Sequence, residues 1–257
     1  MTFEDLFRTR ALSEYGAFLL PSLRDDMTLL DCGCGPGSMA YELADRLHRG
    51  RVVGLDRDDG FRAAMDYARS HPRPNLAFVR GDVERLPFGD ETFDAVFAHS
   101  LVEMLARPVE ALRELRRVLK TGGVAGVAAV DYGGVLIGGE VVAALERFYA
   151  LKEEVWRNVW RSEPRRGRLL RSFLVEAGYR DVVASARYVP YGTPDAVRVF
   201  GEDRARECDR EAFARDAIAA GLTDEAELAA MAAAWRSWGA SPGTFLAFPW
   251  GNAVARK

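Results

Sequence analysis

The sequence predicts an α/β protein whose mostly parallel β-sheet carries helices on both faces. From residue 29 to residue 130, short apolar runs alternate with segments whose apolar residues recur at helical spacing. A glycine-rich loop joins the first apolar run to the first amphipathic segment. Short apolar strands separated by helices indicate a parallel sheet that is covered on both sides.

The first half of the chain supplies most of the expected sheet. Strands are expected at Met27–Leu30, Arg51–Leu55, Leu76–Val79, Phe93–Ala98 and Val124–Val130. Helices are expected at Met39–Leu47, Phe61–Arg69 and Val109–Leu119, the last because Val109, Leu112, Leu115 and Leu119 recur at helical spacing. Before them, Leu6–Leu23 is predicted to be a leading helix that ends near Pro21.

After Asp131 the pattern becomes mostly helical. Glu140–Trp160 and Gly167–Ala177 are predicted helices, Val182–Val189 and Phe245–Ala255 are predicted strands, and Asp195–Trp238 between them is Ala-rich and helical. We expect one domain over residues 1–257, with an N-terminal helical cap at 1–26, a core at 27–131, and helices with the last two strands at 132–257. The helical stretch at about 194–240 is interpreted as an insertion.

Composition and charge exclude several classes of protein. The 257 residues carry 35 Lys+Arg and 38 Asp+Glu, a net charge of −3, and 49% are hydrophobic, as in soluble globular proteins. This balance argues against a nucleic-acid surface. Three cysteines cannot form a disulfide framework, which favours a reducing cytoplasm. Met1–Asp5 lacks signal-peptide features, and the uncharged run Thr121–Val130 is too short to span a membrane.

The loop Asp31-Cys32-Gly33-Cys34-Gly35-Pro36-Gly37 is the strongest local signal. Glycine adopts positive φ and lets a backbone approach a ligand without a Cβ clash. The helix that follows presents free N–H groups and a partial positive charge at its N-terminus. The loop therefore predicts a site for a carboxylate, ribose or phosphate group, and a tight turn without a ligand is the alternative.

Two carboxylates refine the type of ligand. Asp56 follows the second predicted strand, 19 residues beyond Gly37 (56 − 37), where a carboxylate suits ribose hydroxyls; a helix N-cap is the alternative. Dinucleotide-binding loops read G-x-G-x-x-G, whereas here the third glycine comes one residue early and follows Pro36. Asp31 would repel a pyrophosphate but attract a cationic amino group. The negative charge of Asp31 and the glycine spacing therefore favour a nucleoside that carries an amino acid over a dinucleotide.

Over Leu29–Val130, the ordered motifs resemble those of class I S-adenosylmethionine-dependent methyltransferases, in particular the small-molecule group of ubiquinone/menaquinone C-methyltransferases. The glycine loop resembles the first motif, Gly81-Asp82-Val83 with Leu86-Pro87-Phe88 the third, and Phe93–His99 the fourth strand with its active-site end. Leu119-Lys120-Thr121-Gly122-Gly123 resembles the turn before the fifth strand, where Pro is commoner than Thr121. The resemblance implies a Rossmann-like, seven-stranded sheet whose last strand, Phe245–Ala255, is antiparallel.

The resemblance also implies S-adenosyl-L-methionine as cofactor and S-adenosyl-L-homocysteine as product. Residues 27–131 would then bind the cofactor, and the leading helix and the Asp195–Trp238 insertion would cover the acceptor. In the family, the first motif wraps the methionine part, the acid after the second strand binds the ribose, and the third-motif Asp meets the adenine amino group. The expected cofactor-binding residues are Asp31, Gly33, Cys34, Gly35, Asp56, Arg57, Gly81, Asp82, Val83 and His99.

Several of these residues keep a second interpretation. Asp82 is also suited to stabilise a turn, and His99 is a candidate base, a cofactor contact or a plain loop residue. Tyr132 is expected either to line the acceptor pocket or to form a turn, and Tyr15 to close over the cofactor.

Other clusters favour structural interpretations. Cys32 and Cys34 are explained as small residues beside the ligand, and with Cys208 they lack zinc-site spacing, so no metal is expected. The arginines at 157, 161, 165, 166, 168 and 171 are interpreted as a solvated helix face, with an acidic substrate or RNA as the alternative. Trp156 with Trp160, and Trp235 with Trp238, are interpreted as core packing or as an apolar substrate pocket.

The sequence thus predicts a cytoplasmic enzyme that transfers a methyl group from S-adenosylmethionine to a small molecule by in-line displacement. No side chain is assigned as the catalytic base, and neither a nucleic acid nor a membrane is expected as a partner. His99-Ser100-Leu101 stands where adenine N-methyltransferases carry D/N-P-P-Y/F. A non-catalytic module that binds S-adenosylmethionine is the alternative, followed by a nicotinamide-dependent oxidoreductase.

Overall fold

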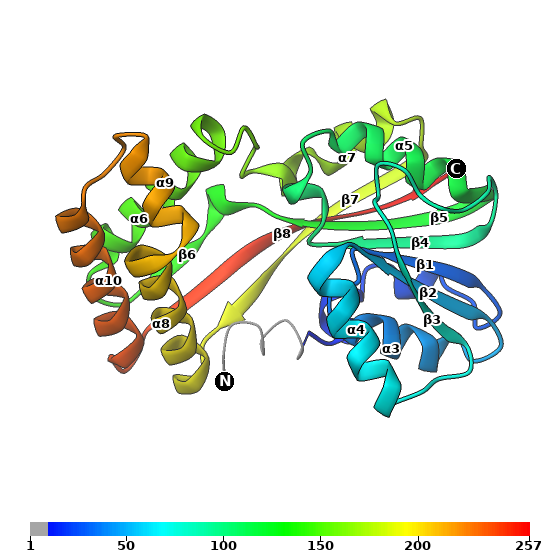
Figure 1. Cartoon of the computed structure of the whole chain (residues 1–257), viewed down its shortest axis with the longest axis horizontal. Helices are drawn as coiled ribbons and strands as arrows, with labels where there is room; N and C mark the ends of the chain where they lie inside the picture. Colours follow the sequence, from blue (N-terminus) through cyan, green and yellow to red (C-terminus); the bar gives the residue numbers. More distant parts are fainter. Residues whose placement is uncertain (1–9) are drawn as a thin grey trace. The chain divides into compact units, whose positions relative to one another are not determined.

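The structure, a computed structural model, describes residues 10–257, apart from the side chains at positions 58, 59 and 210. It divides into two compact units, which are described separately (Figure 1). The sheet unit comprises residues 10–129, Arg166–Ala186 and Gly251–Lys257. The helical unit comprises Val130–Arg165 and Arg187–Trp250.

The sheet unit is built on parallel strands in the order β3-β2-β1-β4-β5. These strands are β1 (Thr28–Cys32), β2 (Arg51–Asp56), β3 (Leu76–Arg80), β4 (Phe93–His99) and β5 (Leu119–Val130). Leu30 lies opposite both Val53 of β2 and Val96 of β4, which makes β1 the central strand. Because β1 is the strand before the glycine loop, the loop emerges at the middle of the sheet.

Two further strands, β7 (Arg180–Tyr191) and β8 (Phe245–Arg256), extend this sheet beyond β5. β8 lies next to β5, and β7 pairs with β8. The backbone N–H of Lys257 donates to Gly123 O near the start of β5, and that of Asp131 donates to Pro249 O just past its end. β8 therefore runs antiparallel to β5, as the family resemblance implied.

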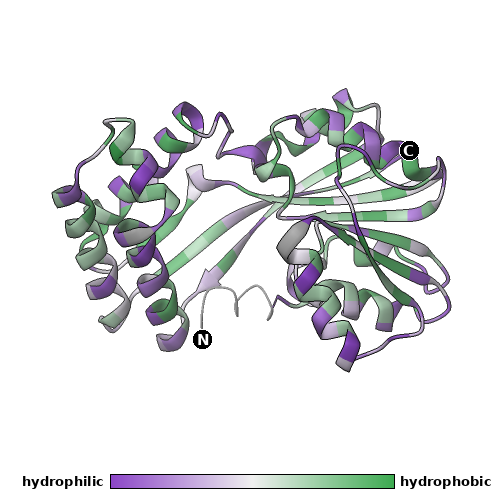
Figure 2. Ribbon diagram, in the orientation of Figure 1, coloured by the Kyte–Doolittle hydropathy of each residue, from purple (hydrophilic) through white to green (hydrophobic). Residues whose placement is uncertain are grey.

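Helices cover both faces of the sheet unit (Figure 1). One face packs under α5 (Pro108–Val118) and α7 (Leu170–Glu176), with Leu112 and Leu174 against Val96. The other packs under α3 (Ser38–Arg46), with Leu43 against Leu29, and α4 (Asp58–Ser70) follows β2. The apolar residues concentrate on the strands, while the outer helix surfaces are hydrophilic (Figure 2). This arrangement confirms the predicted α/β fold with a mostly parallel sheet.

The helical unit packs four helices around aromatic side chains. They are α6 (Val142–Asn158), α8 (Pro194–Arg210), α9 (Ala212–Ala219) and α10 (Glu225–Ala240). Trp235 and Trp238 are fully buried and lie edge to face, with ring centroids 5.5 Å apart, and Trp156 is also buried. Core packing is therefore correct for three of the four tryptophans, whereas Trp160 is 39% exposed and donates to Asp216. No helix in residues 10–257 is both long and apolar enough to cross a membrane.

The structure corrects two expectations and shows how one predicted helical stretch is divided. The predicted leading helix is interrupted: the described part holds only α2 (Leu12–Tyr15) and a 3-10 turn, η1 (Leu20–Ser22), because Gly16 ends α2; residues 6–9 lie outside the described range. The predicted helical stretch Asp195–Trp238 is confirmed as helical, and it is divided among α8, α9 and α10. Within residues 10–257 the sheet has eight strands, not seven, because β6 (Leu136–Gly138) pairs antiparallel with the first residues of β8.

Candidate functional site

The glycine loop is held by backbone conformations that glycine favours. Gly33, Gly35 and Gly37 have φ values of +76°, +52° and +87°, in the left-handed region that is strained for other residues. The N–H groups of Gly33 and Cys34 both donate to Leu55 O, at 2.7 and 3.1 Å. The loop is therefore fixed against the end of β2 rather than free in solvent.

Gly35 is the glycine of this loop that faces open space. A Cβ on Gly33 would lie 3.1 Å from Leu101 Cδ1, and one on Gly37 would lie 2.8 Å from Phe78 Cζ. A Cβ on Gly35 would meet no heavy atom within 4 Å among the neighbours described. Gly33 and Gly37 are thus required for packing, whereas Gly35 leaves room for a ligand to approach the backbone.

Asp31 is a buried carboxylate at the head of the loop. Its exposure is 1%, and Oδ2 has no hydrogen-bond partner among the residues that the structure describes. Burial, with a smaller contribution from the charge of Asp56, raises the pKa of Asp31 to about 7. A buried acid without a partner is costly, and a cationic group beside it would remove that cost. Asp31 and the open face of Gly35 therefore fit the sulfonium nucleoside that the sequence predicted.

Asp56 lies beside the same loop. Its Oδ2 accepts a hydrogen bond from Gly35 N–H at 2.7 Å, and Oδ1 accepts one from Arg57 N–H at 2.7 Å. The N-cap of α4 is Arg57, so Asp56 is not the helix N-cap that was the alternative. This carboxylate orders the glycine loop, and Arg57 itself is exposed.

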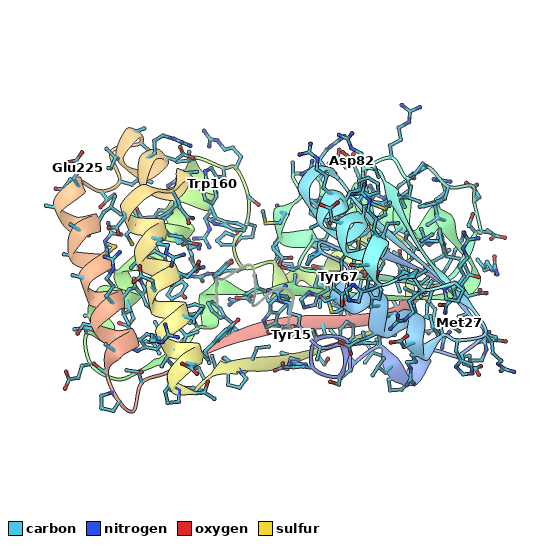
Figure 3. All side chains as sticks on the ribbon, turned by 60° about the horizontal axis from the view of Figure 1, so that its bottom comes forward. Tyr15, Met27, Tyr67, Asp82, Trp160 and Glu225 are labelled. Carbon is cyan, nitrogen blue, oxygen red and sulfur yellow. The ribbon has the colours of Figure 1, made fainter. Side chains whose placement is uncertain are left out.

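The loop after β3 joins this edge through Gly81, whose N–H donates to Asp56 O at 3.0 Å. Asp82 is exposed, labelled in Figure 3, and its Oδ1 accepts a hydrogen bond from Glu84 N–H at 2.9 Å. Asp82 therefore stabilises the turn, and its exposed carboxylate is also accessible to an adenine amino group. Val83 is buried and belongs to the core of the sheet unit.

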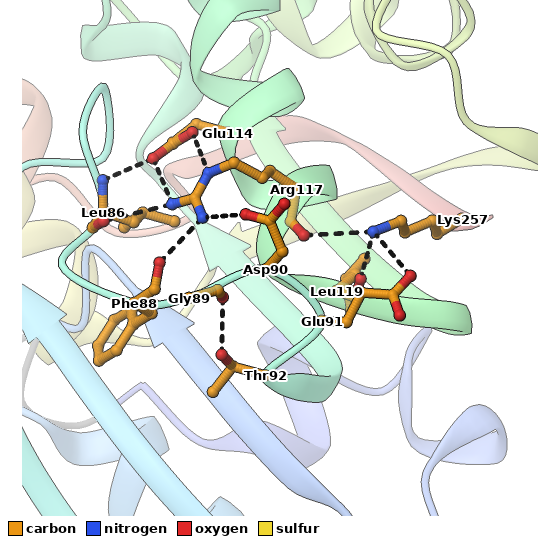
Figure 4. Close-up of polar contacts among 10 residues, drawn as sticks. All are labelled: Leu86, Phe88, Gly89, Asp90, Glu91, Thr92, Glu114, Arg117, Leu119 and Lys257. Carbon is orange, nitrogen blue, oxygen red and sulfur yellow. Dashed lines mark hydrogen bonds and ion pairs between the residues drawn. The ribbon is translucent and has the colours of Figure 1, made fainter.

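Arg117 holds the continuation of this loop (Figure 4). Its Nη1 donates to Phe88 O at 2.9 Å and to Asp90 Oδ1 at 2.7 Å, and its guanidinium also pairs with Glu114. These hydrogen bonds raise the pKa of Arg117 further above its usual range, so the group stays charged. A permanent cation thus fixes the segment after Val83.

His99 ends β4 and is 4% exposed. The Tyr15 ring meets the His99 ring edge to face, with centroids 5.1 Å apart, and Phe97 stacks on it at 6.1 Å. Tyr15, expected to close over the cofactor, therefore packs against a residue expected to contact it. Ser100, the next residue, has a φ of +56°, a strained value that the sequence did not reveal.

The cysteines of the loop are buried free thiols. Burial raises the pKa of Cys32 and of Cys34 well above the usual thiol value, and the nearby Asp31 charge adds to the effect. Both thiols are therefore protonated at neutral pH and unsuited to act as nucleophiles. Their role is steric, which agrees with small residues beside a ligand.

The arginine cluster has two parts. In the helical unit, Arg157 and Arg165 pair with Glu153, at 3.0 and 2.7 Å, as expected for a helix face of paired charges. The prediction that Arg166 is solvated is wrong, because this residue is only 4% exposed. Its Nη1 donates to Val102 O in the sheet unit, a partner distant in sequence.

The helical unit has its own cavity beside Tyr132. The cavity has a volume of about 410 Å³, and Tyr132, Val135, Ile137 and Tyr149 line it. Tyr132 begins the 3-10 turn η3 (Tyr132–Gly134), which the Asp131 carboxylate caps by accepting from Gly133 N–H. Tyr132 therefore forms the expected turn and also lines a cavity, and the role of that cavity as the acceptor pocket stays a prediction.

Comparisons with known proteins agree with this geometry. Residues 30–127 match the family model described as a methyltransferase domain. The chain is 38% identical over 128 residues to the probable methyltransferase ltbC of Aspergillus luteorubrus, an alignment that covers 46% of this chain and 45% of that protein. The chain thus spans less than half of this relative. Residues 30–127 therefore correspond to a methyltransferase domain.

Solved structures establish the fold over nearly the whole chain. The phosphoethanolamine N-methyltransferase 2 of Haemonchus contortus, in complex with phosphomonomethylethanolamine and S-adenosylhomocysteine, superposes with a TM-score of 0.60 at 16% identity, covering 95% of this chain and 53% of that chain. The [4+2]-cyclase SpnF superposes with a TM-score of 0.56 at 24% identity, covering 92% and 77%. The fold is therefore that of class I methyltransferases, and it is shared by a protein named for another reaction.

Proposed function

We propose that this chain, which carries a class I methyltransferase domain over residues 30–127, transfers the methyl group of S-adenosylmethionine to a small-molecule acceptor. The observation that carries the proposal is Asp31, a buried carboxylate whose Oδ2 has no hydrogen-bond partner among the described residues, at the head of a loop whose Gly35 faces open space. This arrangement suits a cation that enters with a nucleoside.

The charges of the site favour this cofactor over a dinucleotide. Asp31 and Asp56 bring two carboxylates to one loop, and a pyrophosphate would be repelled by both. The amino group and sulfonium of S-adenosylmethionine are cationic, and its ribose hydroxyls are hydrogen-bond donors. We assign Asp31 and the loop to the methionine part, Asp56 to the ribose, Asp82 and Val83 to the adenine, and His99 to a cofactor contact.

The bound cofactor supplies a methyl carbon that already carries its leaving group, so an electron pair of the acceptor forms the new bond as the carbon–sulfur bond breaks and its electrons return to sulfur. The chain then has to hold the acceptor in line and exclude water. The positive-φ loop fixes the donor end, and His99 is enclosed by Tyr15 and Phe97. A base is needed only where the acceptor loses a proton.

We place the acceptor beside Tyr132, which follows β5 directly and lines a cavity of about 410 Å³. In open α/β sheets, ligands bind outside the carboxyl ends of the strands. We propose a small-molecule acceptor rather than a nucleic acid, of the kind used by ubiquinone/menaquinone C-methyltransferases, with residues 132–257 forming the acceptor side. The three cysteines are free thiols, which supports a cytoplasmic location.

A second candidate is a protein that binds S-adenosylmethionine without transferring its methyl group. It is favoured by the fold match to a protein named as a cyclase. Two measurements separate the candidates. Calorimetry with S-adenosylmethionine, S-adenosylhomocysteine and NADH tests the cofactor: micromolar binding of the first two alone supports the proposal. Incorporation of labelled methyl into small molecules that co-purify then tests transfer, and binding without incorporation across an acceptor screen would favour the second candidate.

A further inference from the structure

Arg166 is a buried arginine whose guanidinium reaches the loop after β4. It begins the 3-10 turn η4 (Arg166–Leu169), and its Nη1 donates to Val102 O at 2.6 Å and to Leu105 O. These two carbonyls belong to the 3-10 turn η2 (Val102–Met104) and to its C-cap. Buried carbonyls at the end of a helical turn need donors, and a charged donor satisfies them strongly.

The backbone from which the Arg166 side chain extends is held in place by β8. The next residue, Gly167, lies against β8 so closely that a Cβ on Gly251 would be 2.0 Å from Gly167 O. Real side chains never approach a backbone oxygen so closely, so these two backbones are in direct contact. The last strand of the sheet unit therefore holds the segment from which Arg166 extends.

The loop that Arg166 holds touches the glycine loop. Leu101 Cδ1 lies 3.1 Å from the position of a Cβ on Gly33, so Leu101 packs directly on that glycine. At its start, the loop is fixed by Ser100, whose N–H donates to Ala128 O at 3.0 Å and whose Oγ donates to Glu103 Oε1 at 3.0 Å. Its start is thus fixed by β5, and its end by Arg166.

We propose that Arg166 is a positioning residue for the cofactor site, acting through η2 and Leu101 on Gly33. The inference rests on the proposed function, because it assigns the glycine loop to S-adenosylmethionine. Without the guanidinium, the carbonyls of Val102 and Leu105 lose a buried donor, and η2 relaxes toward other partners. Leu101 then leaves Gly33, and the loop loses the conformation that receives the ligand.

A pair of variants tests this proposal. Arg166→Met removes the donors and keeps the alkyl chain, and Arg147→Met is the matched control, since Arg147 Nη2 also donates to a loop carbonyl, Leu222 O, at 3.2 Å in the helical unit. We expect both variants to melt at lower temperature, but only Arg166→Met to bind S-adenosylhomocysteine at least tenfold more weakly by calorimetry. A folded Arg166→Met protein whose affinity stays within twofold of the unchanged chain would overturn the proposal.

Hydrogen exchange separates positioning from general destabilisation. In Arg166→Lys, which keeps the charge but not the two-carbonyl geometry, amides in residues 31–37 and 101–105 should exchange faster while β2 keeps its protection. An equal increase in all three regions would overturn the proposal. This measurement needs no ligand and serves if Arg166→Met does not fold. Failure of the unchanged chain to bind S-adenosylhomocysteine would instead refute the proposed function, and exchange would still decide the role of Arg166.

Discussion

The carboxylate of Asp56 accepts a hydrogen bond from Gly35 N–H at 2.7 Å, so the proposed ribose-binding acid also orders the loop proposed to hold the methionine part. Two proposed subsites of the cofactor are therefore joined by a single contact before any ligand arrives. This preorganisation lowers the conformational entropy that binding would otherwise have to remove.

Asp56→Ala should weaken S-adenosylhomocysteine binding by roughly 1–3 kcal/mol, because it leaves the ribose hydroxyls and Gly35 N–H without an acceptor. Calorimetry provides the measurement. Asp66→Ala is the control, since Asp66 pairs only with exposed Arg69 on α4 among the interactions found for it. Unchanged affinity in Asp56→Ala would refute the ribose assignment.

Asp31 should make cofactor binding depend on pH. Its pKa is raised to about 7, first by burial and then by Asp56, so the group is mostly neutral at pH 6 and mostly ionised at pH 8. A cationic ligand prefers the carboxylate, and affinity should therefore rise roughly tenfold over this interval. Asp31→Asn should bind more weakly and lose most of that rise; the ligand's own amino group titrates equally in both proteins. A profile that is the same in both would contradict the assignment.

The same carboxylate should affect stability in the opposite sense. Because the pKa of Asp31 is raised from 3.8 to about 7 on folding, its favourable contribution is full below about pH 4 and is lost as the pH rises through 7. The ligand-free chain should thus lose stability between pH 5 and pH 8 through this group. Thermal melts of Asp31→Asn should show a smaller loss over that range, and an identical slope would count against the burial of the Asp31 carboxylate.

Gly35→Ala should separate backbone strain from ligand clash. Gly35 has a φ of +52° with an open Cβ position, and Gly221 in the helical unit has a φ of +68° with an equally open position. Alanine at either site should destabilise the chain by about 1–2 kcal/mol, the cost of a left-handed residue. Only Gly35→Ala should lose at least tenfold in S-adenosylhomocysteine affinity. Equal affinities in the two variants would show that the ligand does not approach Gly35.

The sequence predicted the sheet unit well because its signals are local. Leu112 and Leu115 recur at helical spacing, and both are buried in α5. The leading helix was wrong because apolar residues at helical spacing outweighed Gly16, where the helix ends. β6 was missed because a strand of three residues exists only through its pairing with β8, more than a hundred residues later.

The same distinction between local and long-range signals applies to the candidate site. The glycine loop and Asp56 are recognisable because their chemistry follows from residue type and spacing. Arg166 was assigned to a solvated face because its neighbours in sequence are charged. Its partner Val102 is 64 residues away, and nothing in the local pattern identifies a carbonyl as a partner.

The helical unit contains a buried ion cluster whose removal should be far more damaging than that of a surface pair. Glu207 accepts hydrogen bonds from Lys152 Nζ at 3.0 and 2.7 Å and pairs with Arg204 at 2.8 Å. The charges of Arg204 and Lys152 lower the pKa of Glu207 despite its burial, so it stays ionised. Glu207→Gln would leave two buried cations without their shared carboxylate, and should reduce the free energy of unfolding by about 3–5 kcal/mol.

Urea unfolding followed by circular dichroism measures this loss, and α8 offers its own control. Glu202 pairs with Arg206 and Arg236 at 3.7 and 3.2 Å in partly exposed positions. Glu202→Gln should therefore change the free energy of unfolding by less than about 1 kcal/mol. Because both substitutions remove one negative charge from the same helix, their difference isolates burial. Similar losses in the two variants would show that water reaches Glu207 and screens its charge.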